Sequence, residues 1–122
     1  MIDDVDQLPF DNRFTRELPA DPEESGRRRQ VKGAAFSRVP PTPAPAPATL
    51  AWSPEVAELL GLAPELPTTQ AFADVFGGSR VPAGADPFAM AYAGHQFGNF
   101  AGQLGDGRAI ALGEVPAVLP VG

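Results

Sequence analysis

Apolar residues recur at helical spacing near the start of the chain. Phe10, Phe14 and Leu18 lie four positions apart, and Pro9 and Pro19 flank them. Residues that are four apart share one face of an α-helix. The pattern therefore predicts a helical turn that docks on a hydrophobic core.

A clearer helical pattern begins at Ser53. Serine is a favourable N-cap, Pro54 suits the first helical position, and Glu55 favours the positive end of the helix dipole. Gly61 then ends the predicted helix. We assign its apolar stripe to the core; the stripe consists of Val56, Leu59 and Leu60.

A second such helix is predicted over residues 68–76. Thr68 or Thr69 caps it, and the pair Gly77-Gly78 stops it. Its apolar stripe, which we also assign to the core, consists of Phe72, Val75 and Phe76.

A third helix is predicted over residues 86–92. Asp86-Pro87 is typical of a helix start, and Gly94 stops the pattern. The residues in between are mostly apolar, and we expect them to contribute to the same core; they are Phe88, Ala89, Met90, Ala91 and Tyr92.

Residues 39–48 form a proline-rich stretch. In polyproline II geometry this stretch would reach about 31 Å at ~3.1 Å per residue. Two interpretations are open. Pro40 to Pro43 matches the P-x-x-P pattern that binds aromatic-lined grooves. The stretch also suits a stiff connector laid on the surface, which we favour because the match is common by chance in so proline-rich a run.

Residues 94–115 predict two strands and a tight turn. The turn is Gly105-Asp106-Gly107, and Asp-Gly is a strong hairpin signal. We therefore predict that residues 96–103 pair antiparallel with residues 108–115. One face of the second strand carries little side-chain bulk, so that a packed element or a ligand could lie close to its backbone. That face consists of Ala109, Ala111, Gly113 and Val115.

The glycines of this turn fit neither of two common phosphate-binding motifs. Gly102 to Gly107 has the spacing of a P-loop, but Arg108 and Ala109 stand where a lysine and a hydroxyl residue are required. The dinucleotide fingerprint fails because the glycines come in a different order. A plain tight hairpin remains, or a loop that folds over phosphates as the glycine-rich loop of kinases does.

Candidate chemistry is sparse. Arg108 can hold a phosphate through two parallel hydrogen bonds, although a surface ion pair with Glu114 or Asp106 is the interpretation that the residues alone favour. Asp106 is already explained by turn chemistry. His95 is the only histidine, so a multi-histidine metal site is excluded, and we interpret His95 as a hydrogen-bonded structural residue.

Composition narrows the class of protein. The net charge of −6 gives no general attraction to nucleic acid or to an anionic membrane, and no run approaches the apolar length of a membrane span. The acidic start is unlike a secretory leader. The absence of cysteine excludes disulfides and is compatible with a cytoplasmic location. We interpret the cluster Arg27-Arg28-Arg29, with Lys32 close behind, as part of a solvated arm.

Four stretches, taken together and in order, resemble the selenoprotein O family. They are residues 10–14 (Phe-Asp-Asn-Arg-Phe), 36–43 (Phe-Ser-Arg-Val-Pro-Pro-Thr-Pro), 53–62 (Ser-Pro-Glu-Val-Ala-Glu-Leu-Leu-Gly-Leu) and 92–108, which contains Tyr-Ala-Gly-His-Gln-Phe-Gly and Gly-Gln-Leu-Gly-Asp-Gly-Arg. Each motif is weak alone, but four in the same order are specific. The resemblance covers nearly the whole chain up to Val115.

The resemblance implies a function. The family consists of protein adenylyltransferases with a protein-kinase-like fold, which transfer AMP from ATP to a Ser, Thr or Tyr hydroxyl of a protein. Its Gly-Asp-Gly-Arg turn contacts the nucleotide, so Gly105, Gly107 and Arg108 are carried over as ATP-binding residues. The implied cofactors are ATP and Mg²⁺, and the implied partners are ATP and protein substrates, with neither nucleic acid nor membrane.

The family's sequence is several times longer, and its other functional residues come later. They are a lysine in a Lys-Gly-Ala-Gly motif, a catalytic aspartate and the magnesium ligands, and this chain has none of them. Lys32, the only lysine, lies on the other side of the loop. We therefore expect these 122 residues to be inactive alone, with no catalytic or metal-binding residue. The alternative is a non-catalytic, truncated binding or interaction module.

The predicted fold class is α+β. We expect the N-terminal part of a kinase-like lobe, incomplete as a domain, with short helices, a glycine-rich antiparallel β-hairpin and a proline-rich extended segment. The predicted organisation is a charged extension (1–35), a proline-rich connector (36–52), a partial kinase-like lobe with the hairpin (53–115) and a tail (116–122).

Overall fold

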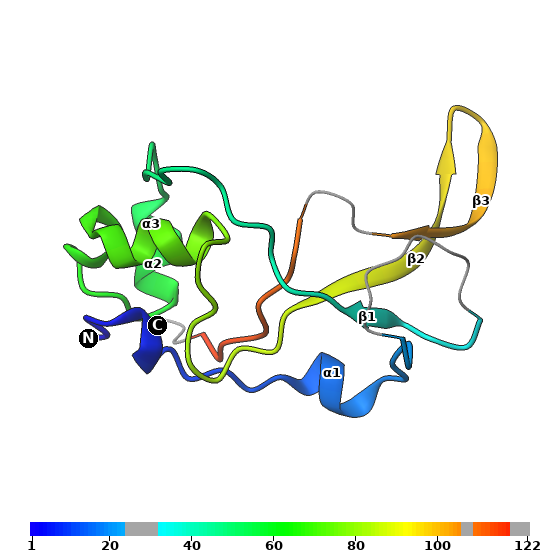
Figure 1. The fold of residues 1–122 in the computed structure, drawn as a ribbon, viewed down its shortest axis with the longest axis horizontal. Coiled ribbons are helices and arrows are strands. Elements are labelled where there is room, and N and C mark those ends of the chain that lie inside the picture. The colour runs from blue at the N-terminus through cyan, green and yellow to red at the C-terminus, as the bar shows by residue number, and fades with distance from the viewer. Residues whose placement is uncertain (24–31, 106–108, 118–122) are drawn as a thin grey trace, which may run out of the picture. The chain divides into compact units, whose positions relative to one another are not determined.

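A computed structural model describes residues 1–23, 32–105 and 109–117, and its ribbon is drawn in Figure 1. The chain forms two compact units, each built from segments that are distant in the sequence. The first comprises Met1–Asp11, Pro41–Ala85 and the chain from Glu114; the second comprises Asn12–Pro40 and Asp86–Gly113. Together they form a small α+β structure, as predicted. The division into 1–35, 36–52, 53–115 and 116–122 stays a prediction.

The first unit is helical. Its elements are η1 (Val5–Gln7), α2 (Pro54–Leu59), η2 (Leu66–Thr68) and α3 (Gln70–Phe76). Two helix caps are as predicted: the Ser53 side chain accepts a hydrogen bond from the Val56 N–H, and that of Thr69 accepts one from the Phe72 N–H. Each bond satisfies a donor that the first helical turn leaves without an intrahelical partner.

The apolar stripe of α2 is not part of the core. Val56 is 52% exposed, and no residue of α2 is buried. The residues just after the helix are buried instead, because the N-terminal segment pairs with them: the Ile2 N–H donates to the Gly61 carbonyl, and the Ala63 N–H donates to the Ile2 carbonyl. For α3 the core prediction holds at Val75, which is 1% exposed, but is wrong for Phe76, which is 52% exposed.

The proline-rich stretch packs across the end of α3. It is bent at Ala46, whose φ is 47°, so it is not a straight polyproline rod. The Gln70 side chain donates to the Pro47 carbonyl at 2.9 Å. A Cβ built on Gly77 would lie 2.7 Å from the Pro47 Cβ, and one on Gly78 would lie 2.7 Å from the Thr42 carbonyl oxygen. The two glycines therefore permit this close approach as well as ending the helix.

The second unit contains the sheet. Its elements are α1 (Arg13–Glu17), β1 (Phe36–Arg38), β2 (Phe88–Gln96) and β3 (Asn99–Gly105). The strands pair antiparallel in the order β1-β2-β3, and Figure 1 shows β2 and β3 as one long hairpin. The predicted helical turn around Phe14 is confirmed as α1.

Three phenylalanines from three elements form the core of this unit. Phe14 of α1 stacks on Phe88 of β2 with ring centroids 4.9 Å apart, and Phe36 of β1 meets both rings at 5.7 and 5.6 Å. Phe36 and Phe88 are 1% and 4% exposed. These contacts fix α1 and the paired ends of β1 and β2 together.

The predicted helix over residues 86–92 is wrong, because residues from Phe88 on form the start of β2. Of its predicted core residues Phe88 is buried, whereas Met90 and Tyr92 are 37% and 48% exposed, because successive residues of a strand point to opposite faces. Phe88 has two backbone pairing partners, and both keep it extended. It pairs with Arg38 of β1, and an isolated β-bridge pairs it with Ala111. A short apolar run without clear periodicity fits a buried strand as well as a helix. Here the long-range pairing decides.

The predicted pairing of residues 96–103 with 108–115 is also wrong. The hairpin instead turns earlier in the sequence, at Phe97-Gly98, so that β3 pairs with β2. The φ angles of Phe97 and Gly98 are 51° and 80°. Positive φ at both central residues is what a two-residue type I′ hairpin turn requires. Among residues 109–115, Ala111 makes the bridge to Phe88 and no strand forms. The expected turn at Asp106-Gly107 lies outside the described residues.

Candidate nucleotide site beside the sheet

Gly105, the last residue of β3, lies within the described residues. It pairs with Ala91 of β2 and is exposed. A Cβ built on Gly105 would lie 3.4 Å from the Met90 carbonyl oxygen, which is an ordinary van der Waals distance, so the packing at this point does not itself require a glycine. The other two predicted nucleotide contacts, Gly107 and Arg108, lie outside the described residues.

A β-bulge interrupts the hairpin next to this pair. Tyr92 pairs with Leu104 and Gly94 pairs with Ala101, so β3 has one residue more than β2 between the two pairs. The extra residue of a bulge is left out of the ladder, and the strand bends there. Bulges are common beside binding and active sites for this reason.

A cavity of about 390 Å³ lies against the bulge. Residues 91–93 of β2 and Gly102 of β3 form one side of its lining, and residues 32–34, which precede β1, form the other. The pairing of β1 with β2 extends just to the edge of this cavity, where the Ala91 N–H donates to the Ala35 carbonyl at 2.9 Å. The volume lies within the range of small-molecule sites.

Of the lining residues that the structure describes, Lys32 is the charged one, and its side chain is exposed. In the sequence, Lys32 precedes the glycine-rich turn, so no role in the site is predicted for it. The structure brings it to the sheet because β1 and β2 pair in the register Phe36 to Met90. No local signal around Lys32 could have revealed this, since the contact depends on strand pairing between distant segments.

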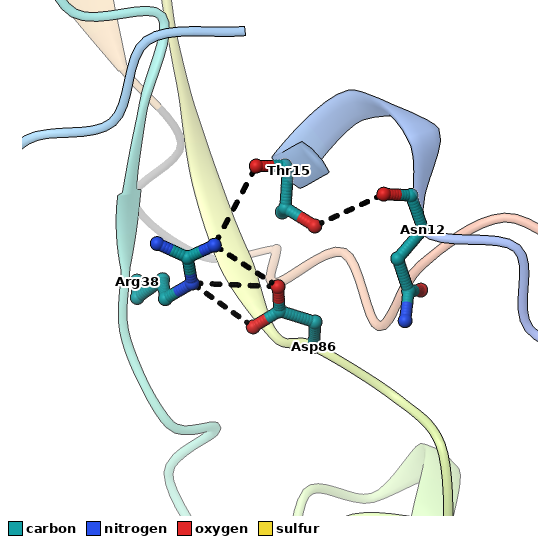
Figure 2. Close-up of polar contacts among 4 residues, drawn as sticks. All are labelled: Asn12, Thr15, Arg38 and Asp86. Atoms are coloured by element: carbon teal, nitrogen blue, oxygen red, sulfur yellow. Dashed lines mark hydrogen bonds and ion pairs between the residues drawn. The ribbon is translucent and has the colours of Figure 1, made fainter. Parts of the chain in front are cut away.

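An ion pair holds the other end of the same strands together (Figure 2). The guanidinium of Arg38, in β1, donates to both carboxylate oxygens of Asp86, with its Nε 3.2 Å from Oδ1. It also reaches the Thr15 carbonyl of α1 at 3.5 Å, and the Thr15 hydroxyl donates to the Asn12 carbonyl at 3.2 Å. This cluster therefore connects α1, β1 and the start of β2.

The pKa of Asp86 is lowered below its ordinary value. Partial burial acts to raise the pKa, but hydrogen bonds from Arg38 and Thr15 and the positive charge of Arg38 outweigh it. Asp86 is therefore a carboxylate at neutral pH. Its place beside Phe88 and Arg38 indicates a structural role for this pair rather than a place in the cavity.

The remaining candidate residues add little. His95 pairs with Phe100 in the β2–β3 ladder, and its predicted structural role stays a prediction. In the part of the chain that the structure describes, no three His, Cys, Asp or Glu residues gather into a metal site. Within the same residues, no helix is both long and apolar enough to cross a bilayer.

Comparison with known proteins supplies the family. The family model "Protein adenylyltransferase SelO" matches residues 26–119. This chain belongs to the SelO family. The match covers the cavity, the bulge and the Gly-Asp-Gly-Arg sequence, and it confirms the resemblance drawn from the four motifs.

Individual SelO relatives agree. The chain is 61% identical over 108 residues to "Protein nucleotidyltransferase YdiU" of Azoarcus sp. (strain BH72), a match that covers 88% of this chain and 21% of the relative. It is 60% identical over 108 residues to the protein of the same name in Rhodopirellula baltica, covering 88% and 20%. With the Xanthomonas campestris pv. campestris (strain 8004) protein, the identity is 57% over 111 residues, covering 91% and 21%. The chain thus spans about a fifth of the length of these relatives.

Proposed function

We propose that this chain forms part of the ATP-binding surface of a protein adenylyltransferase with a kinase-like fold. The nucleotide contacts are Gly105, Gly107 and Arg108. One observation carries the proposal. The segment that matches the SelO family model also contains the cavity, the β-bulge and the exposed Gly105, which lie side by side. A cytoplasmic setting fits this proposal because ATP is available there.

The reaction proposed for the longer family protein is nucleotidyl transfer. A Ser, Thr or Tyr hydroxyl oxygen of a protein substrate forms a bond to the α-phosphorus of ATP. The bond from that phosphorus to the bridging oxygen breaks, and pyrophosphate leaves while the hydroxyl proton passes to a base. Charge develops on the phosphate oxygens, and cationic donors stabilise it.

This chain's share of that work is to position the nucleotide. The paired strands end in a short glycine-containing sequence, so backbone N–H groups can approach a phosphate closely. Arg108 supplies a permanent charge and two parallel donors, which suits a phosphate better than a single point contact does. The family implies Mg²⁺, but the described residues do not gather a set of oxygen ligands, so we assign no metal ligand to this chain.

The second candidate function is a non-catalytic binding module. The chain spans only about a fifth of its relatives, so a pocket that retains part of a nucleotide site without catalysis is consistent with the same cavity. The two candidates differ in one respect. Only the first requires AMP transfer once the rest of a family protein is supplied.

A chimera tests the proposal. This chain replaces the matching segment of the Azoarcus sp. (strain BH72) relative, and transfer of AMP from α-³²P-labelled ATP to an acceptor protein is followed. We expect transfer that falls sharply with Arg108→Ala and is unchanged with Arg13→Ala, which removes an exposed charge from α1. A chimera that folds but gives no transfer, or transfer that is indifferent to Arg108, contradicts the proposal.

A further inference from the structure

We propose that the cavity beside the β-bulge is a phosphate-binding subsite, with Lys32 as its cationic contact. The ligand is a phosphate group of a bound nucleotide. This inference rests on the proposed function for the identity of the nucleotide. It adds Lys32 and the bulge to the glycines and arginine that the family motif supplies.

The first argument is charge. Among the described residues, Lys32 is the ionised side chain of the lining, and none of those lining residues is a carboxylate. The described part of the lining therefore carries a positive charge, in a chain whose net charge is −6. A lysine ammonium is a compact charge with three donors, which suits phosphate oxygens.

The second argument is access to the backbone. Among the described residues of the lining, those other than Lys32 and Tyr92 are alanine or glycine, so on this side a ligand meets main chain rather than bulky side chains. The bulge leaves one residue of β3 out of the ladder at this point, and such a residue has backbone groups available to a ligand. Tyr92, which is 48% exposed, adds a hydroxyl that can donate to a phosphate.

The third argument is position in the sheet. Ala91 lines the cavity and pairs directly with Gly105, the first of the proposed nucleotide contacts. The cavity therefore begins at the strand end from which the Gly-Asp-Gly-Arg sequence continues. A nucleotide held by that sequence has a second cation within the same unit, on the segment before β1.

The single lysine allows a direct test. Because Lys32 is the only lysine, the full chain labelled with ¹³C,¹⁵N-lysine gives one lysine side-chain signal set in NMR spectra. We expect this set, and the backbone amides of residues 91–93, to shift in a saturable way with tripolyphosphate and with ATP. Adenosine, which lacks phosphate, should leave the lysine signals in place.

Matched variants measure the contribution of the charge, with the amides of residues 91–93 as the readout. Lys32→Ala should weaken tripolyphosphate binding about tenfold, as expected for the loss of a charged hydrogen-bond donor. Lys32→Arg, which keeps the charge, should bind nearly as well as the original chain. Arg13→Ala removes a positive charge from α1 of the same unit and should have no effect.

The outcomes separate this inference from the proposed function. If Arg108→Ala impairs the chimera while Lys32→Ala leaves phosphate binding unchanged, the inference is wrong and the proposed function stands. If Lys32 responds to phosphate but Arg108 has no effect on AMP transfer, the subsite is real and the proposed role of the loop fails. If neither tripolyphosphate nor ATP shifts residues 91–93 or Lys32, the subsite does not exist.

Discussion

The Arg38 guanidinium lies against the Asp86 carboxylate, its Nε 3.2 and 3.3 Å from the two oxygens, although 48 positions separate the two residues in the sequence. The pair joins β1 to the residue that leads into β2, next to the stacked rings of Phe14 and Phe88. The cavity beside Lys32 lies further along the same two strands. Its geometry therefore depends on a junction that the ion pair stabilises.

Loss of this pair should destabilise the second unit. We expect Arg38→Ala to lower the free energy of unfolding by about 1–2 kcal/mol, because it removes several charge-assisted hydrogen bonds and leaves a part-buried carboxylate behind. Arg13→Ala, which breaks an exposed i,i+4 pair with Glu17, is the control and should cost about 0.5 kcal/mol or less. Urea unfolding measures both. Equal effects of the two variants would show that the Arg38–Asp86 pair has no special role.

Stability should fall in acid partly through Asp86. Its pKa in the folded protein is lowered, so the stabilisation is fully present above the unfolded pKa of about 3.9 and is lost as the pH falls through the folded value. Unfolding measured from pH 6 downward should therefore show a smaller loss of stability in Asp86→Asn than in the original chain. Parallel curves for the two proteins would contradict the assignment.

Asp6 should behave in the same direction in the first unit. The Ala83 N–H donates to its carboxylate at 2.9 Å, and this hydrogen bond is the largest cause of its lowered pKa. Desolvation acts in the opposite direction and raises the pKa, and the hydrogen bond and positive charge of Arg80 then lower it further. We expect the Asp6 signal in pH-dependent NMR spectra to titrate below that of a model peptide. A titration at the ordinary value would contradict the hydrogen bond to Ala83.

Gly77→Ala tests the packing of the proline-rich stretch on α3. The new Cβ would meet the Ala73 carbonyl oxygen and the Pro47 Cβ, both at 2.7 Å, so one of them has to move. We expect a loss of about 1–3 kcal/mol in the free energy of unfolding. Gly102→Ala is the matched control because its nearest neighbour, a Phe100 ring carbon, is 3.9 Å away. If Gly77→Ala is as stable as Gly102→Ala, the stretch does not pack there.

Arg108→Ala should weaken ATP binding in the chimera. The expected loss is roughly 1.5–3 kcal/mol, the range for hydrogen bonds to charged groups. Calorimetric titration with ATP measures the dissociation constant, and Arg13→Ala again serves as the control. Unchanged affinity would make Arg108 an ordinary surface residue and would remove the loop from the proposed site.

The 122-residue chain alone should not transfer AMP, and it should bind ATP weakly. Nucleotidyl transfer requires cations and donors arranged around the developing charge, and the family motif in this sequence supplies one arginine, Arg108, while Lys32 lines the cavity. Incubation with labelled ATP, Mg²⁺ and an acceptor protein is the direct measurement. Strong labelling that disappears with Arg108→Ala would show that the chain is an enzyme by itself.

Local features of the first unit could be predicted from the sequence. The caps at Ser53 and Thr69 form between residues three apart, so the residue types and their spacing were sufficient to place the starts of α2 and α3. The family could also be predicted, because four motifs in order carry more information than any single one. Gly105 belongs to such a motif, and its role as a nucleotide contact stays a prediction.

Tertiary structure alone decided the sheet and the cavity. Residues 88–92 have the composition of either a helix or a buried strand, and pairing with β1 and β3 made them a strand. The hairpin turn lies at Phe97-Gly98 rather than at residues 105–107 because β3 pairs with β2. Lys32 lies beside the cavity because Phe36 of β1 pairs with Met90 of β2. The physical reason is common to all three: a helix cap is satisfied within one turn of chain, whereas a strand has no hydrogen-bond partner until a distant segment supplies one.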